Sequence, residues 1–143
     1  MRRPASLVPA LVVAALAGCS SPPEGAARIE VNLPEQALNI PGGPAVWANL
    51  HADDDVTVNL VRLSAPIAMH RHLQSEEVVY LLSGEGILHL NGSDRAMEAG
   101  DLFVVPRNTP HGFEPTGPSP AIALSIFTPP QVEGDRIYEG AKK

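Results

Sequence analysis

The sequence predicts a single all-β domain of the sandwich or barrel type, and three observations carry this prediction. The chain of 143 residues holds 15 prolines and 12 glycines, too many for a helical bundle, while 44% of its residues are hydrophobic. From Arg28 onward no stretch keeps helical spacing, and short apolar runs alternate with Gly, Pro, Asn and Asp. Without an N-terminal export segment about 125 residues remain, enough for one core.

Residues 1–18 are typical of an export signal. Met1-Arg2-Arg3 is a short positive segment, and an apolar run of Leu, Val and Ala follows from Leu7 to Ala17. This run is too short to be a comfortable membrane span. The small and apolar residues Leu16-Ala17-Gly18 lead directly to Cys19, the single cysteine of the chain, so no intramolecular disulfide can form.

The segment from Leu16 to Cys19 resembles the lipobox of bacterial lipoproteins. The resemblance implies that Cys19 becomes the lipid-modified first residue and anchors the chain to a membrane. Ser20 after the cysteine resembles the class directed to the outer membrane. We expect the domain at the periplasmic face of the outer membrane in a cell with two membranes, and at the extracellular face of the cell membrane otherwise. The alternative is an ordinary secretory signal followed by a chance cysteine.

The rest of the chain divides into a flexible tether over 19–27, a barrel over 28–130 and a tail over 131–143. The predicted strands are Ile29 to Leu33, Ala45 to Leu50, Val56 to Leu63, Glu77 to Leu82, Gly86 to Leu90, Arg95 to Glu98, Leu102 to Val105, His111 to Glu114 and Ala121 to Phe127. Asn91-Gly92 predicts a two-residue hairpin turn and Gly100-Asp101 a second turn. Pro129 and Pro130 should end the last strand. The tail, including Gly134-Asp135-Arg136, either packs on the barrel or frays.

Four residues are candidates for a metal site. His70 and His72 are two apart, so on an extended segment both imidazoles face the same side. Glu77 opens a strand whose face-mates Val79 and Leu81 suit a barrel interior, and a buried carboxylate is costly unless it is paired or coordinates a metal. His111 follows a turn that could bring a fourth ligand from another strand.

The spacing of these residues resembles the two motifs of the cupin family. His70-x-His72, four residues, Glu77, six residues and Gly84 are similar to the first motif. Gly100, five residues, Pro106 and His111 five positions later are similar to the second. The resemblance covers roughly Ala45 to Phe127. Two departures, Asn108 for the usual glycine and Pro115 for a frequent asparagine, touch no ligand, and Asn tolerates the left-handed conformation of a turn.

The resemblance implies a double-stranded β-helix, or jelly-roll barrel, with a divalent metal bound inside. Three imidazoles and one carboxylate leave coordination positions for water or substrate, as a catalytic site requires. This ligand set of nitrogen and oxygen accepts Fe, Mn, Ni, Co, Cu or Zn. Phe113 shares the face of His111, so it either lines the pocket, with Val79 and Leu81, or fills the core.

Other polar residues are weaker candidates for the site. Glu76 is the rival of Glu77, but the six-residue spacing to Gly84 favours Glu77. His89 should face outward, because Leu88 and Leu90 are in phase with inward positions. The remaining residues read as surface, loop or packing positions: His51, the acidic run Asp53 to Asp55, Arg62, Gln74, Tyr80 and Arg107.

The function classes narrow to two main readings. A net charge of -6 without a clustered basic surface excludes nucleic acid as a partner. The first reading is a metal-dependent enzyme acting on a small molecule as an oxygenase, isomerase or lyase. The second is a module that binds a small molecule or the metal without turnover, and a structural lipoprotein is a weaker third. The cupin resemblance also implies pairing of barrels into a homodimer.

Overall fold

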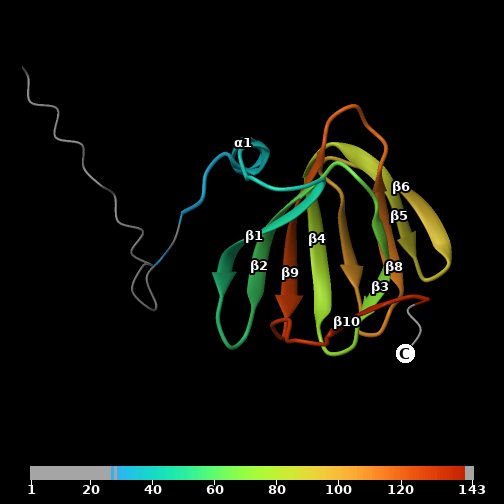
Figure 1. Cartoon of the computed structure of the whole chain (residues 1–143). Coiled ribbons are helices and arrows are strands. Elements are labelled where there is room, and N and C mark those ends of the chain that lie inside the picture. The colour runs from blue at the N-terminus through green and yellow to red at the C-terminus, as the bar shows by residue number, and fades with distance from the viewer. Residues whose placement is uncertain (1–26, 28, 141–143) are drawn as a thin grey trace, which may run out of the picture.

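The computed structural model describes residue 27 and residues 29–140, which form two antiparallel sheets packed face to face (Figure 1). The first sheet has the order β1 (Ala45–Ala52), β2 (Thr57–Leu63), β9 (Ala121–Thr128), β4 (Glu76–Ser83) and β7 (Leu102–Val105). The second has the order β10 (Arg136–Tyr138), β3 (Ile67–His72), β8 (His111–Pro115), β5 (Glu85–Leu90) and β6 (Ser93–Glu98). The expected all-β double-stranded β-helix is confirmed.

The N-terminal predictions lie largely outside this description. The export segment, Cys19 and the tether up to residue 26 are not among the described residues. Within the described part, no helix has the length and apolar character needed to cross a membrane.

Eight of the nine predicted strands are present, each with bounds within two residues of the prediction. The hairpin between β5 and β6 turns at Asn91 and Gly92, whose φ angles of 48° and 80° are both positive, as a type I′ turn requires. Asn108 adopts a φ of 60°, so the asparagine that replaces a glycine does take up the left-handed conformation.

The predicted strand from Ile29 to Leu33 is wrong. Asn32 has a φ of 54°, which ends any extended run, and the helix α1 (Leu33–Leu38) begins directly after it. Pro34 fits the first helical turn, because its missing N–H would have no partner there, and Glu35 suits the positive end of the helix dipole. The helix packs its buried Ala37 against Leu60 and Ile122 on the outer side of the first sheet.

Two strands were not in the predicted set. His70 and His72 lie on β3, the extended segment on which their shared face depends. Pro129 and Pro130 end β9, but they do not end the last strand, because β10 follows and pairs antiparallel with β3. The tail therefore adds an edge strand to the second sheet.

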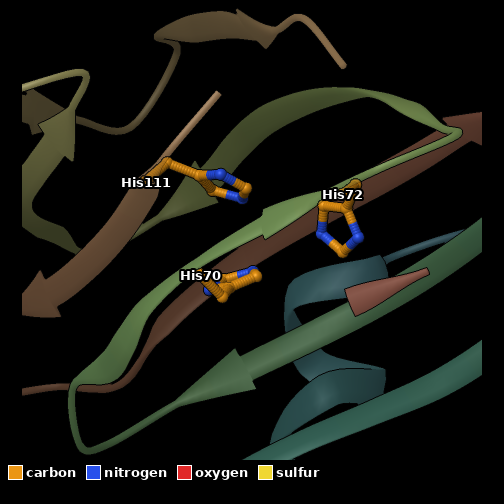
Figure 2. Close-up of side chains that lie close together, drawn as sticks. All are labelled: His70, His72 and His111. Atoms are coloured by element: carbon orange, nitrogen blue, oxygen red, sulfur yellow. The ribbon is translucent and has the colours of Figure 1, made fainter. Parts of the chain in front are cut away.

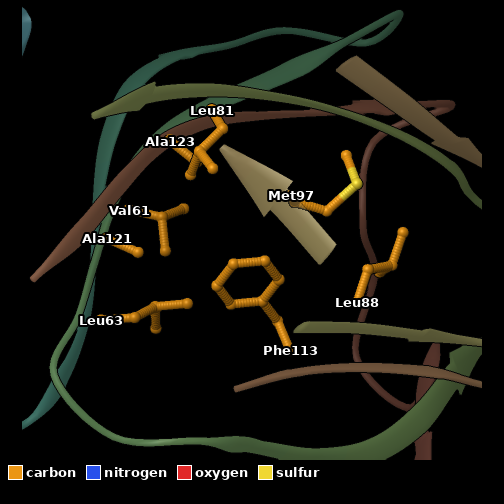
Figure 3. Close-up of a cluster of buried hydrophobic side chains, with 8 residues drawn as sticks. All are labelled: Val61, Leu63, Leu81, Leu88, Met97, Phe113, Ala121 and Ala123. Carbon is orange, nitrogen blue, oxygen red and sulfur yellow. The ribbon is translucent and has the colours of Figure 1, made fainter. Parts of the chain in front are cut away.

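The core fills the space between the two sheets (Figure 3). It consists of buried side chains from both of them: Val61, Leu63, Leu81, Leu88, Met97, Phe113, Ala121 and Ala123. Gly86 is required at its place, because a Cβ there would lie 2.4 Å from Cζ of Phe113. These apolar side chains fill one part of the space between the sheets, and the buried histidines His70, His72 and His111 lie in the remaining part.

Candidate metal centre

Three histidines converge from two neighbouring strands (Figure 2). His70 and His72 lie on β3, and His111 begins β8, where it is the direct cross-strand partner of His70. Cross-strand partners project from the same face of a sheet, so the three rings share the inner face. All three are buried, with exposed fractions of 3%, 1% and 5%.

The geometry of this His triad suits one metal ion. One ring nitrogen of each residue lies within 4.8 Å of the corresponding nitrogens of the other two. Imidazole is a common ligand for Zn, Cu, Fe and Ni, and the described residues bring no sulfur ligand to the cluster. The sequence prediction that these three histidines meet is therefore realised in the fold.

Backbone carbonyls orient two of the rings. Nδ1 of His70 lies 2.8 Å from the carbonyl oxygen of Ala68, and Nδ1 of His111 lies 2.9 Å from that of Thr109. A carbonyl only accepts, so each Nδ1 carries the proton and donates it. The neutral ring of His70 consequently has its lone pair on Nε2, while Nε2 of His111 faces a carboxylate oxygen of Glu77.

A buried carboxylate orients the third ring. Oδ2 of Asp135 lies 3.1 Å from Nδ1 of His72, and Oδ1 accepts hydrogen bonds from the backbone N–H groups of Gln74 at 2.6 Å and Ser75 at 3.3 Å. The side-chain amide of Gln131 also lies 2.9 Å from Nδ1 of His72, where the amide oxygen can accept from the same N–H. Asp135 is completely buried, so these contacts replace its hydration.

The inner nitrogen of His72 has no hydrogen-bond partner among the described residues. Its Nε2 is buried and makes no hydrogen bond in the described part of the chain. A buried nitrogen lone pair without a donor is costly, and a metal ion at this place would satisfy it. The three histidines therefore fit a divalent metal ion, as imidazole ligands predict.

Glu77 lies beside two members of the triad. Its Oε2 lies 3.1 Å from Nε2 of His111 and 3.8 Å from Nε2 of His72, and its Oε1 accepts a hydrogen bond of 2.5 Å from the Ser125 hydroxyl. Burial alone would raise the pKa of this carboxyl, but the hydrogen bonds from His111 and Ser125 outweigh it and hold the pKa below its usual value. Glu77 is therefore an ionised carboxylate beside the triad.

Burial keeps two of the histidines neutral. It lowers the pKa of His70 to about 4, and it lowers the pKa of His72 against the opposing effect of the Glu77 charge. Metal ligation requires the unprotonated ring, so both side chains are in the required state at neutral pH.

A cavity of about 60 Å³ opens beside the ligands. Its walls are mainly apolar and include the predicted residues Val79, Leu81 and Phe113. The polar residues that line it are His70, Glu77, His111, Ser125 and Arg136. Such a volume holds roughly four water molecules, so it accepts a ligand of only a few non-hydrogen atoms.

The weaker candidates lie elsewhere. His89 pairs with Asp94 at 2.6 Å on the outside of the second sheet, and His51 pairs with Asp53 at 2.9 Å in an exposed loop. The other residues considered as weaker site candidates do not line the cavity: Glu76, Arg62, Gln74, Tyr80 and Arg107. The expectation that they serve the surface or the packing agrees with these positions.

Sequence reasoning missed three residues at the centre, Ser125, Asp135 and Arg136. Ser125 interrupts the otherwise apolar run of β9 and pairs with Val79, so a polar residue at an inward position was the available signal. Asp135 and Arg136 had no local signal, because β10 has only three residues.

Comparisons with known proteins agree with the fold. The family model described as "Cupin domain" matches residues 61–127. An oxalate-binding protein of Thermotoga maritima is 31% identical over 103 residues, which are 66% of this chain and 85% of that protein. A Klebsiella pneumoniae protein with a double-stranded β-helix domain superposes with a TM-score of 0.62 at 25% identity, covering 73% of this chain and 91% of that one.

Two further relatives match over a smaller share of their length. An uncharacterized protein of Methanocaldococcus jannaschii is 32% identical over 76 residues, and the match spans 53% of this chain and 61% of that protein. An acireductone dioxygenase of Alcanivorax borkumensis is 41% identical over 66 residues, which are 43% of this chain and 35% of the enzyme. The likeness to the dioxygenase therefore covers about a third of that protein.

Proposed function

Because the chain belongs to the cupin family, we propose that it is an exported, lipid-anchored cupin that binds a divalent metal ion and acts on a small molecule as a metal-dependent enzyme. The ligands are His70, His72, Glu77 and His111. The observation that carries the proposal is the buried His triad, whose outer nitrogens are hydrogen-bonded and whose inner nitrogens converge beside an ionised carboxylate. A divalent Fe, Mn, Ni, Co, Cu or Zn ion fits this donor set.

The residues around the ligands have separate tasks. Ser125 holds the carboxylate of Glu77, and Asp135 holds the ring of His72. The mainly apolar walls lower the local dielectric, which strengthens electrostatic contacts made inside the cavity. When bound, the metal supplies a Lewis acid or an oxygen-binding centre, as oxygenase, isomerase or lyase chemistry requires.

A second function, binding without turnover, is favoured by a specific observation. The relative that this chain covers to 85% of its length is named an oxalate-binding protein, whereas the dioxygenase is covered to 35%. Among the described residues, the cavity lining also holds no carboxyl or imidazole group besides the proposed ligands. Proton transfer needs such a group within hydrogen-bond reach, so a capture role for a small molecule is the alternative.

The first experiment is elemental mass spectrometry of the full chain, purified in detergent without added metal. We expect near-stoichiometric metal in the parent and a sharp loss in His70→Ala and Glu77→Ala. His89→Ala is the matched control, because it removes a histidine outside the cavity and should keep the metal. Absence of metal from the parent, even after reconstitution, would contradict the proposal.

The anchor has its own test. Replacement of Cys19 by Ala should release the chain from the membrane fraction and abolish incorporation of a labelled fatty acid in the source cell. Unchanged membrane retention and labelling in Cys19→Ala would contradict lipidation at this residue. The barrel lies beyond the cytoplasm in this proposal, at the cell envelope.

A further inference from the structure

The tail presents two side chains to the metal centre. In the pairing of β10 with β3, Arg136 is opposite His72 and Tyr138 is opposite His70. Cross-strand partners share a face, so Arg136 and Tyr138 project toward the side of the sheet that carries the His triad. Arg136 lines the cavity, and the Tyr138 ring lies 5.8 Å from the ring of His70.

The guanidinium of Arg136 is held by an aromatic ring. Its Cζ lies 5.3 Å from the centre of the Trp47 ring, which also lines the cavity. In the described part of the chain no carboxylate oxygen lies within 4.0 Å of its nitrogens. A cation–π contact fixes the position of a guanidinium and leaves its five N–H donors available.

Glu77 is not the ion-pair partner of Arg136, because in the described part of the chain its oxygens lie within 4.0 Å of His72 and His111 but not of the guanidinium. Among the described residues it is the single acidic residue in the cavity lining, and its oxygens contact the His111 ring and the Ser125 hydroxyl. With a divalent ion bound beside Glu77, the cavity would hold more positive than negative charge. A cavity of about 60 Å³ with apolar walls and uncompensated positive charge favours a small anion.

We propose that this cavity binds a small carboxylate, whose charge is recognised by the Arg136 guanidinium beside the metal centre. The inference rests on the proposed function and names the substrate class of the same site. Arg is suited to this task because its planar fork matches the geometry of a carboxylate. The role assigned to Arg136 is binding of the anion, while Trp47 positions the guanidinium.

The test uses the full chain in detergent, loaded with Co²⁺, and two probes of equal size. Glycolate carries a carboxylate, and glycolamide is its neutral counterpart. Calorimetry should show that glycolate binds more tightly, and that Arg136→Gln weakens glycolate binding about tenfold or more while glycolamide binding stays unchanged. Arg136→Lys, which keeps the charge, should retain part of the preference.

Arg71→Gln is the matched control. It removes the same charge from the neighbouring strand, at a residue that lies between two inward histidines and pairs with Glu139 at 3.6 Å. We expect glycolate binding to be unchanged in this variant. An equal loss in Arg71→Gln and Arg136→Gln, or a parent that binds both probes equally, would overturn the inference.

The cobalt absorption spectrum separates failure of this inference from failure of the proposed function. A parent chain that takes up no cobalt would overturn the proposed function together with the inference. A parent with the spectrum of histidine-bound cobalt and no preference for glycolate would overturn the inference alone. Loss of the cobalt spectrum in both Arg136 variants would show that Arg136 acts by holding β10 in place, and this result would also overturn the inference.

Discussion

Replacement of Asp135 by Asn should weaken metal binding without unfolding the barrel. In the same orientation, the Asn side chain keeps Oδ1, which accepts from the backbone N–H groups of Gln74 and Ser75. It replaces Oδ2, which faces Nδ1 of His72 at 3.1 Å, by an NH₂ group. Two donors cannot face each other, so Nδ1 becomes an acceptor and the ring proton moves to Nε2, where it competes with the metal.

The magnitude follows from the loss of one such oriented ligand. Removal of a carboxylate partner of a ligating histidine costs about 10- to 100-fold in metal affinity, or about 1.4–2.7 kcal/mol. Rotation of the Asn amide would avoid the conflict at His72. It would instead place the NH₂ group against two buried N–H groups and lose both of their hydrogen bonds.

The assay is competition for Co²⁺ or Zn²⁺ between the full chain and a chromogenic chelator, with thermal unfolding in excess chelator as the check of the fold. Asp94→Asn is the control, because Asp94 makes the same contact with the surface histidine His89 at 2.6 Å. We expect the parent affinity in this control. Parent affinity in Asp135→Asn, or an equal fall in both variants, would refute the reasoning.

Three further predictions follow from the same contacts. His72→Ala and His111→Ala should each lower metal occupancy sharply, measured by elemental analysis, and leave the β-rich circular dichroism spectrum; full occupancy in both would contradict the site. The metal-free chain should lose stability toward urea as the pH falls from about 6.5 to 4. Burial lowers the pKa of His70 to about 4, so in this range the His70 ring takes up a proton only in the unfolded chain, which is thereby favoured. His70→Ala should reduce this dependence of stability on pH. Gly86→Ala should lower the free energy of unfolding by about 1–3 kcal/mol, since its Cβ would lie 2.5 Å from a backbone oxygen, whereas Gly43→Ala, in open space, should change it little.

The sequence was sufficient for the local part of the fold. Strands of alternating or continuous apolar residues between turn residues were found close to their predicted bounds, because side-chain alternation and turn chemistry act within a few residues. The shared face of His70 and His72 follows from their spacing alone once the segment is extended. The position of Glu77 follows from the phase of Val79 and Leu81, which line the same cavity.

The sequence was insufficient where the structure depends on distant pairing. The strand expected from Ile29 to Leu33 had suitable residues, but no strand of the described part of the chain pairs with it, and Ile29 and Val31 are 88% and 66% exposed. Asp135 reaches His72 across 63 positions of sequence, and β10 is too short to show alternation. The register of an edge strand depends on its partner, and a single sequence does not carry that information locally.

The short C-terminal tail contributes two residues to the surroundings of the candidate metal centre. Asp135 meets the outer nitrogen of His72, and the next residue, Arg136, enters the cavity, so two consecutive residues act on opposite sides of the same ligand set. The family match ends at residue 127 and includes neither of them. In the proposed function the four ligands hold the metal, whereas the affinity for the metal and the preferred charge of the bound small molecule depend on residues after the match. A cupin with the same four ligands but no carboxylate behind the second histidine should therefore hold its metal more weakly than this chain.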